Sequence, residues 1–155
     1  MQIKDIFKGK VLLVGVGNSL RGDDSAGSEL IRRCLIKKIQ CGLLDAEMSP
    51  ENFINKIVNS NYETVILVDS VDMRETPGTI RIFSPDEISG ISFSTHNASL
   101  KVFFEFITSQ KPKIKTYLIG IQPKTLKLNE KISQEVDKSI DKLIEELNKL
   151  YERSF

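Results

Sequence analysis

Three predominantly apolar runs constrain the fold of this chain more than any other feature of the sequence. They are VLLVGV at 11–16, TVILV at 64–68 and KTYLIGI at 115–121. A strand that buries one face alternates apolar and polar residues, whereas a continuous apolar run is typical of a strand buried on both faces. The three runs therefore predict the central strands of a sheet that is covered on both sides.

Helices and shorter strands are predicted between these runs. Helices are predicted at 25–39, 50–58, 100–107 and 132–150. Apolar residues recur at helical spacing in the first and the last of these, and Pro50 suits the first turn of the second. Two further strands are predicted at 43–46 and, as an edge strand after the Pro77-Gly78 turn, at 79–83. Strands alternating with helices predict one α/β domain over residues 1–155, with a twisted, mostly parallel sheet and helices on both faces in three α/β/α layers.

Composition excludes several classes of protein. The formal net charge is +1, so no strong basic field favours nucleic acid or an anionic membrane as a partner. No apolar run approaches the about 20 residues that cross a membrane, and residues 1–10 lack the apolar stretch of a signal peptide. We therefore expect a cytoplasmic protein. We also expect a monomer, because no feature of the sequence requires a higher oligomeric state. Cys34 and Cys41 match no common zinc motif, and we expect two small buried thiols.

The loop after the first predicted strand is rich in glycine and resembles a phosphate-binding loop only in part. A dinucleotide-binding fingerprint requires glycine where this chain has Leu20. Gly17 and Gly22 have the separation of a P-loop, but Asp23 and Asp24 follow them in place of lysine and serine or threonine. Because this exchange reverses the charge, the loop favours a cation over a phosphate. Helix capping is the alternative, and we expect one acid to cap the following helix and the other to face the cleft.

Two more residues with metal-ligand chemistry follow later strands. Asp69 comes directly after the run at 64–68, and His96, the only histidine, lies in a small polar stretch before a predicted helix. Either residue alone is compatible with a structural role. Because loops converge beyond the carboxyl ends of parallel strands, Asp24, Asp69 and His96 together form a candidate site for Zn²⁺, Mn²⁺, Fe²⁺ or Ni²⁺.

The chain resembles the hydrogenase maturation endopeptidases in several segments that appear in the same order. The segments are GNSLRGDDSAG at 17–27, SPEN at 49–52, VDSVD at 68–72, PGT at 77–79, THN at 95–97 and LIGIQP at 118–123. The segments at 49–52 and 118–123 are similar to the branch that serves formate-hydrogenlyase-type hydrogenases. Ser25 and Glu47 depart from the family pattern, and neither is one of the three candidate ligands.

The resemblance implies a peptidase that removes a C-terminal extension from the precursor of the nickel–iron hydrogenase large subunit after nickel insertion. It also implies that Asp24, Asp69 and His96 are the metal-binding and catalytic residues, with nickel supplied by the substrate or another divalent ion in its place. The sequence offers no nucleophilic triad, because His96 is the only imidazole and its use as a metal ligand removes it from the role of base. A general metal-dependent hydrolase with its own ion and a non-catalytic anion-binding module are the alternatives.

Overall fold

Five strands form one sheet in the computed structural model, which describes residues 1–88 and 97–152. Their order across the sheet is β2-β1-β3-β5-β4. The first four in this order run parallel, and β4 pairs with β5 in the antiparallel direction at the edge. The strands are β1 (Val11–Gly15), β2 (Gly42–Asp45), β3 (Thr64–Ser70), β4 (Ile80–Phe83) and β5 (Lys115–Ile121). The mostly parallel sheet and the edge strand are thus confirmed.

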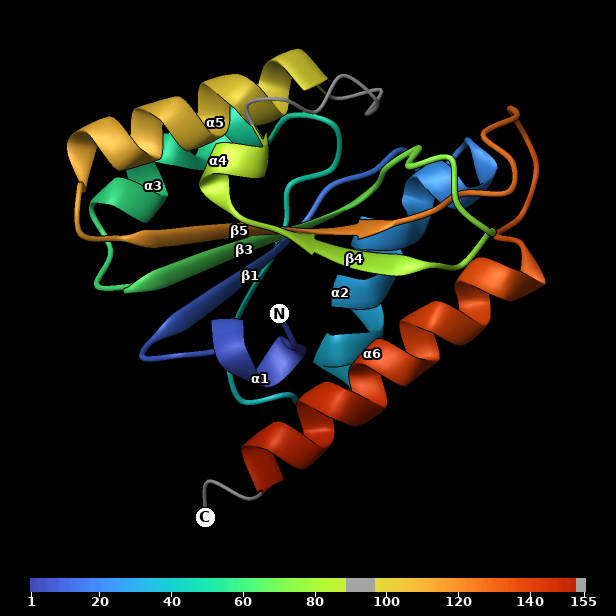
Figure 1. Cartoon of the computed structure of the whole chain (residues 1–155), viewed down its shortest axis with the longest axis horizontal. Helices are drawn as coiled ribbons and strands as arrows, with labels where there is room; N and C mark the ends of the chain where they lie inside the picture. The colour runs from blue at the N-terminus through green and yellow to red at the C-terminus, as the bar shows by residue number, and fades with distance from the viewer. Residues whose placement is uncertain (89–96, 153–155) are drawn as a thin grey trace.

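Helices cover both faces of this sheet, as predicted (Figure 1). One face carries α1 (Ile3–Ile6), α2 (Ala26–Ile36) and α6 (Gln134–Glu152). The other carries α3 (Ile54–Val58), α4 (Pro85–Ile88) and α5 (Asn97–Gln110). Two short 3₁₀ helices, η1 (Gly22–Ser25) and η2 (Pro50–Phe53), lead into α2 and α3. None of the described helices is both long and apolar enough to span a membrane.

The central strands are buried on both faces because their side chains alternate between two cores. In β1, Leu13 packs beneath α2 and α6, while Leu12 and Val14 pack toward α3 and α5. In β3, Ile66 packs in the core beneath α2 and α6, and Leu67 packs in the core beneath α3 and α5. Apolar burial on this scale contributes about 25 cal/mol for each Å² removed from water. This arrangement is why the apolar runs of the sequence are continuous rather than alternating.

The order of the strands creates a switch point between β1 and β3. From β1 the chain crosses through α2 to β2 on one side, and it then returns through α3 on the opposite face to β3 on the other side. The loop that leaves β1 therefore leads to α2 on one face of the sheet, whereas the loop that leaves β3 runs to β4 at the edge. In open α/β sheets, a crevice at such a point beyond the carboxyl ends of the strands is the usual place for a ligand.

Two features differ from the prediction. The third strand continues two residues beyond the predicted 64–68, so Asp69 and Ser70 belong to β3 itself. The short helices α1 and α4 were not expected, because four residues are too few to show an apolar period.

Candidate functional site

Two of the three candidate ligands lie at the switch point of the sheet. Asp24 belongs to η1, at the end of the loop that leaves β1, and Asp69 is the penultimate residue of β3. Both side chains are buried, with 3% of Asp24 and 0% of Asp69 exposed. Burial of a carboxylate costs free energy unless hydrogen bonds or positive charge offset that cost. Two acids buried at a switch point of the sheet are therefore candidates for a functional role.

Ser70 links the two carboxylates. Its hydroxyl donates a hydrogen bond to Oδ1 of Asp24 at 3.3 Å, and its backbone N–H donates to Oδ1 of Asp69 at 2.8 Å. One residue thus contacts both acids and brings side chains 45 positions apart in sequence to the same end of the sheet. Sequence reasoning did not single out Ser70, although its position directly after Asp69 is a signal that could have found it.

Close packing of α2 on the sheet sets the position of η1. A Cβ added to Gly27 would lie 2.2 Å from the carbonyl oxygen of Val68 and 2.3 Å from that of Val16. A Cβ on Gly17 would lie 2.2 Å from the carbonyl oxygen of Asp24. Both glycines therefore permit backbone approaches that no larger residue allows. The glycines of this loop hold the acids close to the strands instead of surrounding a phosphate.

Asp23 has a structural role that differs from the predicted one. Its carboxylate accepts hydrogen bonds from the backbone N–H groups of Lys124 and Thr125 at 2.8 and 3.1 Å. It also accepts from the N–H and the hydroxyl of Ser133 at 2.7 and 2.8 Å. Neither η1 nor α2 has a side-chain cap, so the expectation that one acid caps the following helix is wrong. Asp23 instead fastens the loop before α6, 110 residues away in sequence.

His96 lies outside the described residues, so its predicted place in the site stays a prediction. Within 1–88 and 97–152, no three His, Cys, Asp or Glu side chains are grouped as a metal site. A metal site that includes Asp24 and Asp69 would therefore need a further ligand from the rest of the chain or from a substrate. In sequence, His96 directly precedes α5, whose first turn lies on the side of the molecule where β1, β3 and β5 end (Figure 1).

The loop after β3 is held by a side chain that the sequence did not identify as important. Gln122, directly after β5, accepts hydrogen bonds at Oε1 from the N–H groups of Met73 and Glu75. Its Nε2 donates to Oδ1 of Asp72 at 3.1 Å. Asp72 is exposed. A buried glutamine thus determines the course of the chain just beyond Asp69.

Neither cysteine contributes to this site. Cys34 is buried in α2, as predicted, whereas Cys41 is only partly buried before β2. Burial raises the pKa of the Cys34 thiol to about 12 and that of Cys41 to about 11. Both thiols therefore stay protonated at neutral pH and are poor nucleophiles and poor metal ligands.

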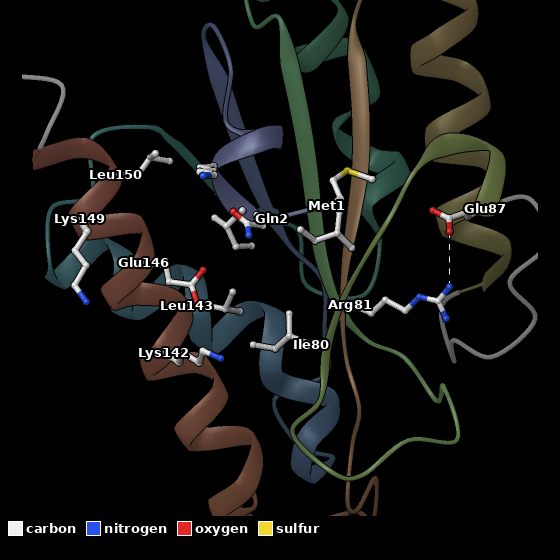
Figure 2. Close-up of a pocket in the computed structure, with 13 residues that line it drawn as sticks. Met1, Gln2, Ile80, Arg81, Glu87, Lys142, Leu143, Glu146, Lys149 and Leu150 are labelled. Atoms are coloured by element: carbon white, nitrogen blue, oxygen red, sulfur yellow. Dashed lines mark ion pairs between the residues drawn. The ribbon is translucent and has the colours of Figure 1, made fainter.

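A groove of about 890 Å³ lies elsewhere, between β4, α6 and the N-terminal segment. Figure 2 shows Ile80, Leu143 and Leu150 along it, with an ion pair between Arg81 and Glu87 at 3.7 Å. Neither Asp24 nor Asp69 lines this groove. The candidate site is therefore recognised by its chemistry and its place in the sheet, not by the size of a hollow.

Comparison with known proteins agrees with the fold. A family profile described as hydrogenase maturation protease matches residues 26–150, a range that includes Asp69 and begins two residues after Asp24. The hydrogenase 3 maturation protease of Escherichia coli K12 is 34% identical over 114 residues, which cover 72% of each chain. The crystal structure of a [NiFe] hydrogenase maturation protease, HycI, from Thermococcus kodakarensis superposes with a TM-score of 0.84 at 26% identity, covering 97% of this chain and 98% of that one.

A second solved structure, the endopeptidase HycI from Escherichia coli, superposes with a TM-score of 0.77 at 27% identity, covering 91% of this chain and 90% of that one. The fold, the matched range of 26–150 and the sequence identity all indicate the same family. This chain belongs to the hydrogenase maturation protease family.

Proposed function

We propose that this chain removes the C-terminal extension of a nickel–iron hydrogenase large-subunit precursor and recognises the precursor's nickel through Asp24, Asp69 and His96. The observation that carries the proposal is the pair of buried carboxylates joined through Ser70 at the switch point of the sheet. Family membership supplies the reaction, the hydrolysis of a peptide bond in a hydrogenase precursor.

The chemistry of the donors supports nickel carried by the substrate as the ion that is recognised. Two carboxylate oxygens and one imidazole nitrogen suit a borderline divalent metal and leave coordination positions for the precursor's own ligands. A cation also offsets the cost of burying two acids at one place. Cleavage then depends on nickel loading, and the dependence links processing to completed metal insertion.

The branch of the family is also part of the proposal. The Escherichia coli relative is named for hydrogenase 3. The segments at 49–52 and 118–123, which resemble the formate-hydrogenlyase-type branch, include Pro50 at the start of η2 and Gln122 beside the loop after β3. We therefore expect a hydrogenase of this type as the substrate.

Substitution of the three candidate ligands tests the site. Asp24→Ala, Asp69→Asn and His96→Ala should each abolish processing of the nickel-loaded precursor, measured by intact mass. Glu145→Gln, at an exposed position of α6, is the control and should process normally. Because the alternative hydrolase would carry its own ion, the metal content of the purified protein is measured as well. Undiminished processing by the three variants, or stoichiometric zinc that survives dialysis, would contradict the proposal.

A further inference from the structure

Three exposed apolar side chains lie on loops that follow the carboxyl ends of parallel strands. They are Leu20 after β1, Met48 after β2 and Leu128 after β5, with 61%, 50% and 55% of each residue exposed. A single exposed apolar residue needs no explanation, but several on one surface mark a site of interaction. Whether these three share a surface depends on how their loops are connected.

Backbone hydrogen bonds join the three loops around Asp24. The N–H of Gly17 donates to the carbonyl of Glu47 at 2.7 Å, which ties the first loop to the neighbour of Met48. The N–H of Asn129 donates to the carbonyl of Leu20 at 2.8 Å, which places the neighbour of Leu128 against Leu20 itself. In the same first loop, the N–H of Asn18 donates to the carbonyl of Asp24 at 3.0 Å. The loops that carry the three apolar residues are therefore joined to one another beside Asp24.

The backbone beside two of these residues adopts a conformation that is unfavourable for residues other than glycine. Glu47, next to Met48, has a φ of 52°, and Asn129, next to Leu128, has a φ of 62°. Left-handed backbone costs about 1 kcal/mol or more at a residue such as Glu47 and less at an asparagine, which adopts it more readily. Both loops are thus held in a defined shape while they present an apolar side chain to solvent.

Charge on the same loops favours one class of partner. Arg21, Lys127 and Lys131 are exposed beside Leu20 and Leu128, and none of them forms an ion pair within the described chain. The exposed acids on the same loops are fewer, Glu130 near Leu128 and Glu47 beside Met48, so cations predominate around Leu20 and Leu128. Lys124 is different, because Glu135 pairs with it at 2.8 Å. A surface with apolar residues flanked by unpaired cations complements a partner surface with apolar residues flanked by carboxylates.

We infer that Leu20, Met48 and Leu128 form an apolar rim that docks the folded body of the precursor, with Arg21, Lys127 and Lys131 facing acidic residues of that body. The inference rests on the proposed function, because it names the surface through which that substrate reaches Asp24 and Asp69. The rim binds the precursor at a distance from the peptide bond that is cut. Its loss should therefore raise KM and leave kcat nearly unchanged.

A pair of matched double variants tests the rim. Leu20→Ser with Leu128→Ser should raise KM for the nickel-loaded precursor, and its Kd in a direct binding measurement, at least tenfold, while kcat stays within twofold. Leu35→Ser with Ile36→Ser is the control, because these residues are 59% and 64% exposed at the opposite end of α2. The control should leave all three constants within twofold. Thermal melting checks that both variants are folded.

A charge variant separates the contribution of the cations. Lys127→Glu with Lys131→Glu should raise Kd at low salt, and the difference from the wild-type chain should shrink as salt rises, because screening weakens exposed charges. Unchanged KM and Kd in the Leu20 and Leu128 variant would overturn the inference. A second outcome would also overturn it: the wild-type chain sediments as a dimer, and the Leu20 and Leu128 variant is a monomer with the wild-type KM. The rim would then bind a second copy of the chain. If the wild-type chain binds the precursor but does not cut it, the proposed function fails. The comparison of Kd values still shows whether the rim binds the precursor.

Discussion

At Asp23, four hydrogen-bond donors from the chain between 124 and 133 converge on one buried carboxylate. Its neighbour Asp24 instead faces Ser70 at the end of β3. The two acids therefore divide structural support and the candidate chemistry between them. This division also makes Asp23 a poor candidate for a general base, because its two oxygens together accept four hydrogen bonds from the protein.

Replacement of Asp23 by asparagine should destabilise the fold. The amide keeps the volume but turns an NH₂ group toward N–H donors, and the loss of charge-assisted hydrogen bonds should lower the free energy of unfolding by about 2–4 kcal/mol. Urea unfolding measures this change. Glu145→Gln, an exposed acid-to-amide change on α6, should alter stability by less than about 0.5 kcal/mol. Equal stability of the Asp23 variant and the wild-type chain would contradict the assigned role.

Among the elements, α2 is the one on which the site most depends, because η1 and Asp24 lead directly into it. Gly27 brings its first turn against the carbonyl oxygens of Val16 and Val68. Farther along, Arg33 ties it to α6 through Asp137 at 2.5 Å and Asp141 at 2.8 Å, and it also pairs with Glu29 within α2. The position of this helix is thus determined at both the sheet and the neighbouring helix.

Gly27→Ala should destabilise the protein although alanine favours helix. In an exposed helix the change would stabilise by about 1 kcal/mol. Here the added methyl group has no room, and overpacking should instead cost about 1–3 kcal/mol. The added methyl group should also displace η1, which carries Asp24, and so slow precursor processing. Leu35→Ala on the exposed side of α2 is the comparison and should change neither quantity appreciably. A more stable, fully active Gly27 variant would contradict the close approach.

The pH dependence of stability should include a contribution from Glu29. Hydrogen bonds from Arg32 and then Arg33 lower the pKa of Glu29 from 4.5 to about 2. A lowered pKa in the folded state stabilises the protein above pH 4.5, and this contribution is lost as pH falls toward 2. Because Glu29 is partly solvated, we expect about 1 kcal/mol. Glu29→Gln should therefore be less stable than the wild-type chain at pH 7 and equally stable near pH 2, by urea unfolding. A difference that does not vary with pH would contradict this contribution.

For the whole molecule, the sequence predicted the layered fold well because its main signal is local. The run at 64–68 is continuous since β3 is buried on both faces, and the stripe at 132–150 is periodic since α6 buries only one. The partner of Asp23 could not be predicted, because Ser133 lies 110 residues away and no local pattern links them. The two acids of the candidate site were found from the sequence because each follows an apolar strand, while the link through Ser70 required the fold.

The chain is a peptidase of the hydrogenase maturation family. The central proposal is that it recognises nickel on its precursor. Intact-mass measurement of nickel-loaded and nickel-free large-subunit precursor, each incubated with the wild-type chain, tests this most directly. We predict loss of the C-terminal extension from the nickel-loaded precursor alone. Equal cleavage of the nickel-free precursor would show that Asp24, Asp69 and His96 do not act through the precursor's metal.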